Sequence, residues 1–266
     1  MTVTGTPVRA QFTPREPREC RRALGFDPER PVILVMGGSQ GAHGINDLVQ
    51  QALPELTRLE PDWQWLHLTG SLDANEVKQA YESLHTRAMV RPFLDNMELA
   101  LGAATAAISR AGASSLAELA AIRLPALLIP YPAATENHQF FNAQAFETAG
   151  AASLIDQKRA KVQMVTERLV ELVRNGPLRQ KMQSALAQWE APRAAEQIAE
   201  TIVSALGIKP IEGSGARPGG HGARAGSAQS FMNGLGSTVL STAAPTVHVV
   251  GGVVATTPAH YPRRRA

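Results

Sequence analysis

Three segments of this 266-residue sequence carry residue types that suit the binding of anions and hydroxyl groups. The first, Gly37-Gly38-Ser39-Gln40-Gly41-Ala42, separates an apolar run from a helical pattern. Glycines let backbone amides come close to an anion, and the amino end of the following helix adds partial positive charge. The spacing matches neither G-x-G-x-x-G nor the Walker pattern, so the segment favours a diphosphate over a classical dinucleotide or ATP. Its other interpretation is a tight turn from strand to helix.

The same segment also fits G-x-S-x-G, the nucleophile elbow of α/β-hydrolases. In that interpretation Ser39 is the nucleophile and His138 the base. No HGGG-type oxyanion segment precedes it, and no evident acid stands beside His138 to orient the imidazole. We therefore keep a hydrolase only as a remote alternative.

The second segment, Ser109-Arg110-Ala111-Gly112-Ala113-Ser114-Ser115, precedes a helical pattern that contains Glu118. Small residues at a helix start leave backbone N–H groups free for a ligand. The carboxylate of Glu118 suits the hydroxyls of a sugar, in the way that an acidic residue binds a ribose in dinucleotide sites. Its other interpretation is a charge partner of the helix dipole.

The third segment covers residues 130–139 and ends in Glu136-Asn137-His138-Gln139. Amide and imidazole groups both donate and accept hydrogen bonds, so they suit hydroxyls and acetamides better than phosphates. The alternative is that Asn137 merely caps the next helix.

The elements that must position these segments alternate between short apolar runs and helical patterns, which predicts a parallel, doubly wound α/β sheet. Ligands bind such sheets beyond the carboxyl ends of the strands, where all three segments lie. Helical patterns alone continue over residues 162–206. The expected strands are residues 32–36, 63–68, 88–93, 106–109, 126–129 and 152–155.

Composition excludes several classes of protein. No stretch approaches the ~20 apolar residues of a membrane span, the N-terminus lacks a signal-peptide pattern, and a cytoplasmic location is expected. Cys20 is the only cysteine, so there is no internal disulfide framework and no cysteine-based zinc cluster. Residues 208–266 hold six of the 26 Lys and Arg but one of the 23 Asp and Glu, so the basic balance does not belong to the fold. Those residues are rich in Gly, Ala, Ser and Thr and are expected to be mostly disordered.

Taken together, residues 3–207 resemble the C-terminal half of the MurG family of GT-B glycosyltransferases, glycosyltransferase family 28. The resemblance implies a Rossmann-like donor-binding domain over residues 10–207, an interdomain junction remnant over residues 1–9 and a low-complexity tail over residues 208–266. The matching segments are Gly5-Thr6-Pro7-Val8-Arg9, Gly37 to Ala42, Pro92-Phe93-Leu94-Asp95-Asn96-Met97, Ser109 to Glu118, and Glu136 to Gln139 with Asn142-Ala143.

The resemblance implies that UDP-GlcNAc is the ligand and that no metal or other cofactor is required. Backbone groups of Phe93 and Leu94 would read the uracil, Arg9 and the Ser39 loop would hold the diphosphate, and Glu118 would bind the ribose. His138 and Gln139 would bind the GlcNAc, and Ala113, Ser114 and Ser115 would lie against the sugar and phosphates. The complete set of expected donor-binding residues is Arg9, Gly38, Ser39, Gln40, Gly41, Phe93, Leu94, Met97, Ala113, Ser114, Ser115, Glu118, His138 and Gln139.

The family's reaction moves GlcNAc to undecaprenyl-diphosphate-MurNAc-pentapeptide and forms lipid II for peptidoglycan, at the cytoplasmic face of the inner membrane. The family's N-terminal domain, which binds the lipid-linked acceptor and is expected to hold the general base, has no counterpart in this sequence. Two alternatives therefore stay open, a UDP-GlcNAc-binding subunit of a split transferase and a module that only binds.

Overall fold

The computed structural model describes residues 3–38 and 40–207. Ser39 and the predicted tail over residues 208–266 lie outside the described residues. The chain forms two units, and within the described residues the first unit ends at Ile198 and contains all the strands. The described part of the second unit is Ala199 to Gly207, which includes the end of one helix.

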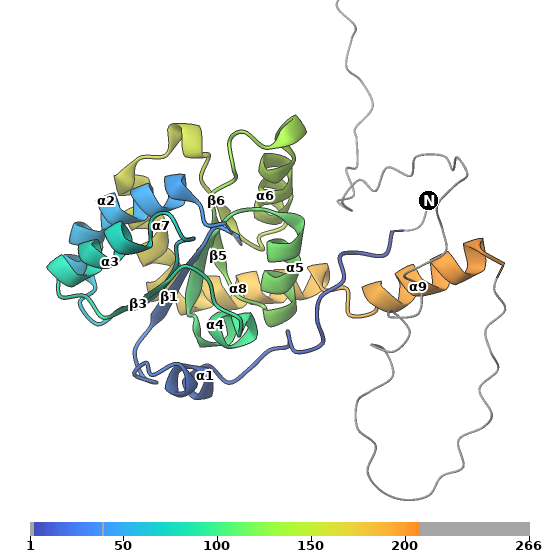
Figure 1. Ribbon diagram of the computed structural model, residues 1–266, viewed down its shortest axis with the longest axis horizontal. Coiled ribbons are helices and arrows are strands. Elements are labelled where there is room, and N and C mark those ends of the chain that lie inside the picture. Colours follow the sequence, from blue (N-terminus) through green and yellow to red (C-terminus); the bar gives the residue numbers. More distant parts are fainter. Residues whose placement is uncertain (1–2, 39, 208–266) are drawn as a thin grey trace, which may run out of the picture. The chain divides into compact units, whose positions relative to one another are not determined.

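A six-stranded parallel sheet with the order β3-β2-β1-β4-β5-β6 forms the centre of the first unit (Figure 1). The predicted doubly wound α/β class is confirmed, and each expected strand is found to within two residues at either end. The chain leaves β1 toward β2 and β3, then returns to add β4 on the other side. That reversal creates a crevice between the carboxyl ends of β1 and β4. The strands are β1 Val32–Met36, β2 Gln64–Leu68, β3 Ala88–Arg91, β4 Ala106–Ser109, β5 Ala126–Leu128 and β6 Ser153–Leu154.

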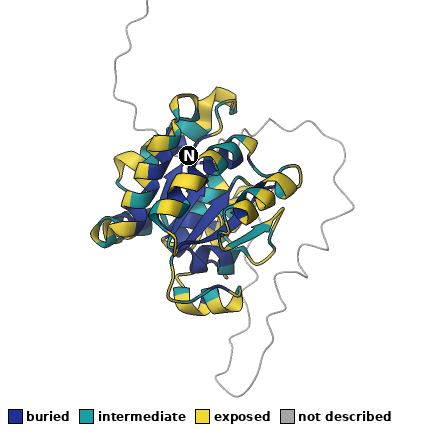
Figure 2. Ribbon diagram, turned by 90° about the vertical axis from the view of Figure 1, so that its left-hand side faces the viewer, coloured by how far each residue is buried: buried dark blue, intermediate teal, exposed yellow. Residues whose placement is uncertain are grey.

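Alternate residues of β1 face opposite sides of the sheet, as the two-residue period of a strand requires. Leu34 belongs to one buried apolar cluster, while Ile33 and Val35 belong to the other. Figure 2 shows the buried sheet between helices whose outer faces are exposed. The first cluster contains residues of α4 Met97–Ala103, α5 Ala113–Ile122 and α6 His138–Thr148, and the second contains residues of α2 His43–Leu59, α3 Ala74–Ser83 and α7 Val162–Arg174. The short helix α1 Pro17–Ala23 packs against α4.

The predicted helical region after residue 162 is also confirmed. α7 is followed by α8 Gly176–Leu186, which begins with a proline in its first turn and is capped by the side chain of Asn175. The short 3₁₀ helix η3 Ala187–Trp189 then brings Trp189 against Phe146 of α6, with ring centroids 4.3 Å apart. The last helix is α9 Ala194–Ala205.

Within the described residues, no helix is both long and apolar enough to span a bilayer. Cys20 is buried in α1, and burial raises the pKa of its thiol, with Arg15 opposing that rise.

Candidate functional site

The loops at the carboxyl ends of β1, β4 and β5 each lead into the N-terminus of a helix. The residues at the N-cap positions of α2, α5 and α6 are Ala42, Gly112 and Asn137, and none of them makes a side-chain capping hydrogen bond. First-turn amides of these helices are therefore open to a ligand, and the helix dipoles favour an anionic one. Asn137 occupies the N-cap position of α6, but its side chain does not act as the cap.

The loop after β1 contains two glycines with positive φ, 92° at Gly38 and 79° at Gly41. The amide of Gly41 donates to the carbonyl of Gly38 at 3.0 Å, which closes a tight turn. A Cβ on Gly41 would lie 2.0 Å from the carbonyl oxygen of Thr69, so this turn touches the loop after β2 backbone to backbone. Gln40 is exposed in the same turn, while Ser39 lies outside the described residues. Only glycine satisfies both the backbone angle and the close approach at position 41.

The first turn of α5 holds Ala113, Ser114 and Ser115, as the sequence predicted. Glu118 lies beyond that first turn and is half-buried, so it is poorly placed to act as a partner of the helix dipole. Burial raises the pKa of its carboxyl, and the positive charge of Arg9 opposes that rise. The fold therefore brings Arg9, from the N-terminal segment, into the electrostatic environment of Glu118.

The segment after β3 contains the residues expected to read the uracil. The side chain of Phe93 is 56% exposed, while Leu94 and Met97 pack partly buried against the first apolar cluster. Met97 is also the first residue of α4. The backbone of this segment is joined to the loop after β2 through the amide of Gly70, which donates to the carbonyl of Pro92 at 3.0 Å.

The loop between β5 and α6 orients two polar side chains. Glu136 and Asn137 are both left-handed, with φ of 51° and 56°, a conformation that costs non-glycine residues about 1 kcal/mol or more each. His138 lies 2.8 Å through Nδ1 from the carbonyl of Thr135; since a carbonyl only accepts, Nδ1 carries a proton, and Nε2 on the other side of the ring is left for a ligand. Oε1 of Gln139 accepts from the amide of Tyr131 at 3.0 Å, which turns the Nε2 amide group of Gln139 toward other acceptors.

This geometry argues against the hydrolase alternative. A triad histidine needs an acid that binds Nδ1 and orients the ring. Here Nδ1 of His138 is bound by a backbone carbonyl. Among the described residues no carboxylate is bonded to this imidazole.

Two groups of polar residues near the site were not identified from the sequence. Arg110 is buried at the end of β4, although its segment was singled out for its small residues. Asn46 and His67 are buried beneath the loops after β1 and β2 and bond to each other at 3.0 Å. For Asn46 and His67, the only signal in the sequence was a polar residue at a position where the helix or strand pattern calls for an apolar one.

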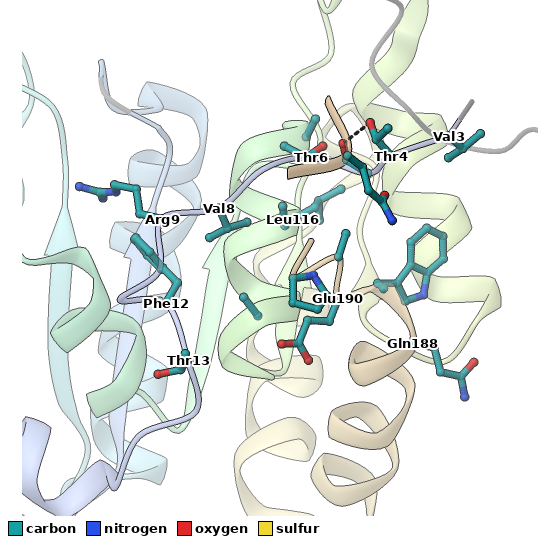
Figure 3. A pocket seen from close by; sticks show the side chains of 18 of the residues that line it. Val3, Thr4, Thr6, Val8, Arg9, Phe12, Thr13, Leu116, Gln188 and Glu190 are labelled. Atoms are coloured by element: carbon teal, nitrogen blue, oxygen red, sulfur yellow. Dashed lines mark hydrogen bonds between the residues drawn. The ribbon is translucent and has the colours of Figure 1, made fainter. Parts of the chain in front are cut away.

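A cavity of about 550 Å³ lies beside these loops, between the N-terminal segment, α5, α6 and the residues around Trp189. Figure 3 shows the N-terminal segment running past Leu116 of α5, with Glu190 on the other side of the hollow. Of the expected donor-binding residues that the structure describes, only Arg9 and Ala113 line it. We therefore place the candidate site at the strand ends, with this cavity as its neighbour.

The described residues contain no group of three or more His, Cys, Asp or Glu side chains arranged to hold a metal ion. The polar groups at the strand ends are instead free amides, an arginine, a carboxylate, an imidazole and a carboxamide. This set can bind a diphosphate and several hydroxyl groups at once.

Comparison with known protein families gives a match over most of the described chain. Residues 32–198 match the model of the glycosyltransferase family 28 C-terminal domain. A relative from Synechococcus elongatus, named UDP-N-acetylglucosamine--N-acetylmuramyl-(pentapeptide) pyrophosphoryl-undecaprenol N-acetylglucosamine transferase, is 40% identical over 213 residues, which cover 77% of this chain and 57% of the relative. A relative of the same name from Carboxydothermus hydrogenoformans is 44% identical over 154 residues, 57% of this chain and 41% of the relative. The chain spans about half the length of the curated relatives it matches.

Solved structures agree with the fold. The crystal structure of MurG from Acinetobacter baumannii has a TM-score of 0.60 at 24% identity, covering 77% of this chain and 56% of that one. The glycosyltransferase from Rickettsia africae has a TM-score of 0.55 at 13% identity, covering 74% and 54%. The predicted architecture, one half of a GT-B fold, is confirmed.

Proposed function

This chain belongs to glycosyltransferase family 28 through its C-terminal domain, and from that membership we propose that it is the donor-binding half of a transferase that uses UDP-GlcNAc. The acceptor in this proposal is undecaprenyl-diphosphate-MurNAc-pentapeptide and the product is lipid II of peptidoglycan synthesis. The single observation that carries the proposal is the 40% identity over 213 residues to a relative whose name states this transfer.

The placement of the site residues supports the assignment of a separate group of residues to each part of the sugar nucleotide. The segment with Phe93, Leu94 and Met97 would bind the uracil through its backbone, and Glu118 would accept hydrogen bonds from the ribose hydroxyls. The diphosphate would bind at Arg9, the Gly38 to Gly41 turn, and the uncapped first turn of α5 at Ala113, Ser114 and Ser115. His138 and Gln139, with Nε2 atoms available for a ligand, would bind the GlcNAc hydroxyls and acetamide.

The chemistry that this arrangement supports is the departure of UDP. As the acceptor C4 hydroxyl attacks the anomeric carbon, the bond between that carbon and the diphosphate oxygen breaks and negative charge grows on the diphosphate. Fixed N–H groups, a helix dipole and a guanidinium stabilise such charge without reorganising. The proton of the acceptor hydroxyl passes to a general base that we assign to residues outside this chain.

We also propose that the acceptor is bound by a domain or partner chain outside these residues, at the cytoplasmic face of the membrane. The greater length of the relatives supports a further domain or chain that binds the acceptor. Orientation of the two substrates contributes ~7 to 11 kcal/mol to such transfers, and a positioned base ~10²- to 10⁴-fold in rate. We therefore expect this chain alone to bind the donor without measurable transfer.

The proposal is tested first by binding. A ligand that binds only the folded state stabilises it by RT ln(1 + [L]/Kd), about 2.7 kcal/mol at a hundredfold excess over Kd. UDP-GlcNAc should raise the melting temperature of the full chain, and ADP-glucose and NAD should not. Equal shifts with all three ligands would contradict a uracil-specific site.

The second test is transfer to a lipid-linked muramoyl acceptor, with radiolabelled donor. The chain alone should give none, and fusion of a family N-terminal domain ahead of Val3 should restore it. Robust transfer by the unfused chain would place the base among its own residues.

A further inference from the structure

The loops after β1, β2 and β3 are joined at the backbone, in a row along one edge of the sheet. The Gly41 turn touches the carbonyl of Thr69, and a Cβ on Gly70 would lie 2.2 Å from the carbonyl oxygen of Gln40. Gly70 in turn donates to the carbonyl of Pro92, directly before Phe93. A displacement of the middle loop would therefore alter both the turn and the Phe93 segment beside it.

One buried side chain spans this row of loops from below. Asn46, in the first turn of α2, is 1% exposed, and its Nδ2 donates both to the carbonyl of Thr69 at 3.0 Å and to Oδ2 of Asp73 at 2.7 Å. Asn46 thus ties the start of α2, which follows the Gly41 turn, to both ends of the loop after β2. The bond to a carboxylate is charge-assisted, the stronger kind.

The two acceptors of Nδ2 fix the orientation of this amide, which stands in a buried chain of hydrogen bonds. Because both acceptors face Nδ2, Oδ1 of Asn46 faces Nε2 of His67 at 3.0 Å and must accept from it. Burial lowers the pKa of His67 to about 3, despite the opposing charge of Asp73, so the ring is neutral and its Nδ1 accepts from the hydroxyl of Tyr81 at 3.2 Å. Each group in this chain therefore donates a hydrogen bond to the next: Tyr81 donates to His67, His67 to Asn46, and Asn46 to Asp73.

We propose that Asn46 is a positioning residue for donor binding, which holds the Gly41 turn and the Gly70 loop together so that the diphosphate and uracil subsites keep their spacing. The inference deepens the proposed function, because it assigns the residue that sets the shape of that same site. Asn46 lies beneath the loops and acts through their backbones. The two acceptors of Nδ2 and the Nε2–H donor of His67 fix its orientation, and Asp73 is its anionic acceptor.

Amide hydrogen exchange measured by NMR on the ligand-free full chain tests the positioning. In Asn46→Ala the amides of Gly41 and Gly70 should exchange about tenfold faster or more, since the change removes a neutral and a charge-assisted hydrogen bond. The amide of Leu34 in the central strand should change only by the loss in global stability. Tyr81→Phe is the matched control, because it removes a hydrogen bond from the same buried chain and leaves both contacts of Asn46 with the loops.

Asp73→Asn gives a second variant at a half-buried position, in case Asn46→Ala does not fold. It replaces the charged acceptor and should also release Gly41 and Gly70 relative to Leu34. If Tyr81→Phe releases Gly41 as much as the Asn46 or Asp73 variants at equal loss of stability, or if Gly41 exchange follows only global unfolding, the positioning role is wrong.

Calorimetry with UDP-GlcNAc separates this inference from the proposed function. The Asn46→Ala variant should raise Kd about tenfold or more, while Tyr81→Phe should change it by less than about threefold. Wild-type protein that does not bind UDP-GlcNAc would contradict the proposed function, and the exchange data would still decide whether Asn46 braces the loops.

The Asn46→Asp variant adds a test based on the pH dependence of donor binding, which a purely structural role of Asn46 would not change. At neutral pH it places a second carboxylate beside Asp73, and the like charges should weaken donor binding. Below about pH 5 a proton shared by the two carboxyls should restore one link, so the ratio of variant to wild-type Kd should fall. A ratio that does not change with pH would contradict the bond to Asp73 as the working contact.

Discussion

Arg110 donates a hydrogen bond of 2.6 Å from Nη1 to Oε1 of Gln157, joining the end of β4 to the 3₁₀ helix η2 Gln157–Arg159. The same nitrogen reaches the carbonyls of Ile129 at 2.9 Å and Pro130 at 3.1 Å, and the guanidinium lies 5.5 Å from the ring centroid of Tyr131. Burial lowers the pKa of Arg110 to about 10, so it stays charged at neutral pH. In the described part of the chain no carboxylate pairs with it. A single buried cation thus holds the start of the loop that presents His138 and Gln139.

Replacing Arg110 by Met should therefore lower the free energy of unfolding by about 1 to 3 kcal/mol, because two carbonyls lose a charged donor while one buried charge is removed. Urea denaturation measures the loss. Arg87→Met is the matched control, since the exposed Arg87 also donates to one carbonyl, that of Gly25 at 2.9 Å, and should cost less than about 1 kcal/mol. If the free energy of unfolding falls no more in Arg110→Met than in Arg87→Met, the buried contacts of Arg110 do not stabilise the fold as expected.

Glu118→Gln should weaken UDP-GlcNAc binding by about 1 to 3 kcal/mol, because the ribose hydroxyls would lose a charged acceptor. Titration calorimetry measures it, with Glu171→Gln on the exposed side of α7 as the control. Since burial raises the pKa of Glu118, wild-type affinity should fall as the pH drops through the range above its ordinary value of 4.5. That acid-side loss should be smaller in Glu118→Gln, and unchanged affinity at preserved stability would remove Glu118 from the site.

Substitutions at two glycines of the first loop should differ sharply. Gly41→Ala forces a Cβ to within 2.0 Å of the Thr69 carbonyl oxygen, whereas a Cβ on Gly38 meets nothing within 4 Å. Gly38→Ala should cost only the positive-φ strain, about 1 kcal/mol. Gly41→Ala should cost more in thermal unfolding and also reduce donor affinity, because the two loops must separate. Similar behaviour of the two variants would mean that the loop contact does not constrain binding.

His43, the exposed first residue of α2, lies 3.1 Å through Nδ1 from Oδ2 of Asp73 and 3.3 Å through Nε2 from Asp47. The hydrogen bond to Asp73 and the charges of Asp47, Asp73 and Glu76 raise the pKa of His43, and desolvation opposes them only weakly. A histidine whose pKa is higher in the folded state than in the unfolded state stabilises the fold when it is protonated. This stabilisation is complete at a pH below the unfolded-state pKa, near 6.5, and it disappears as the pH rises through the folded-state pKa. The difference in melting temperature between wild type and His43→Gln should therefore be largest on the acid side of this range.

The titration of the His43 ring, followed by NMR, checks the cause directly. Asp73→Asn should return the pKa of His43 toward its ordinary value, because it removes the largest contribution. Glu76→Gln should change it little. A His43 ring that titrates identically in all three proteins would contradict the ion pair.

Much of the fold followed from hydrophobic periodicity. The runs at residues 32–36 and 106–109 coincide with β1 and β4 because buried parallel strands read as continuous apolar stretches between turn residues. The helix α1 Pro17–Ala23 was not predicted, since its exposed, charged sequence has only Cys20 as a buried residue. The loops were identified because glycine and small residues at a helix start have a local physical reason.

Local sequence also determined the chemistry of the loops, namely which segments offer free amides, a carboxylate, an imidazole and a carboxamide. Only the tertiary structure decided which of these groups meet. The order β3-β2-β1-β4-β5-β6 sets the β1 and β4 loops side by side, and the positive charge of Arg9 reaches Glu118 across a separation of more than one hundred residues. The hydrogen bonds of Asn46 and Arg110 depend on side-chain positions in three dimensions, because a polar residue on a buried face has no partner that spacing along the chain reveals.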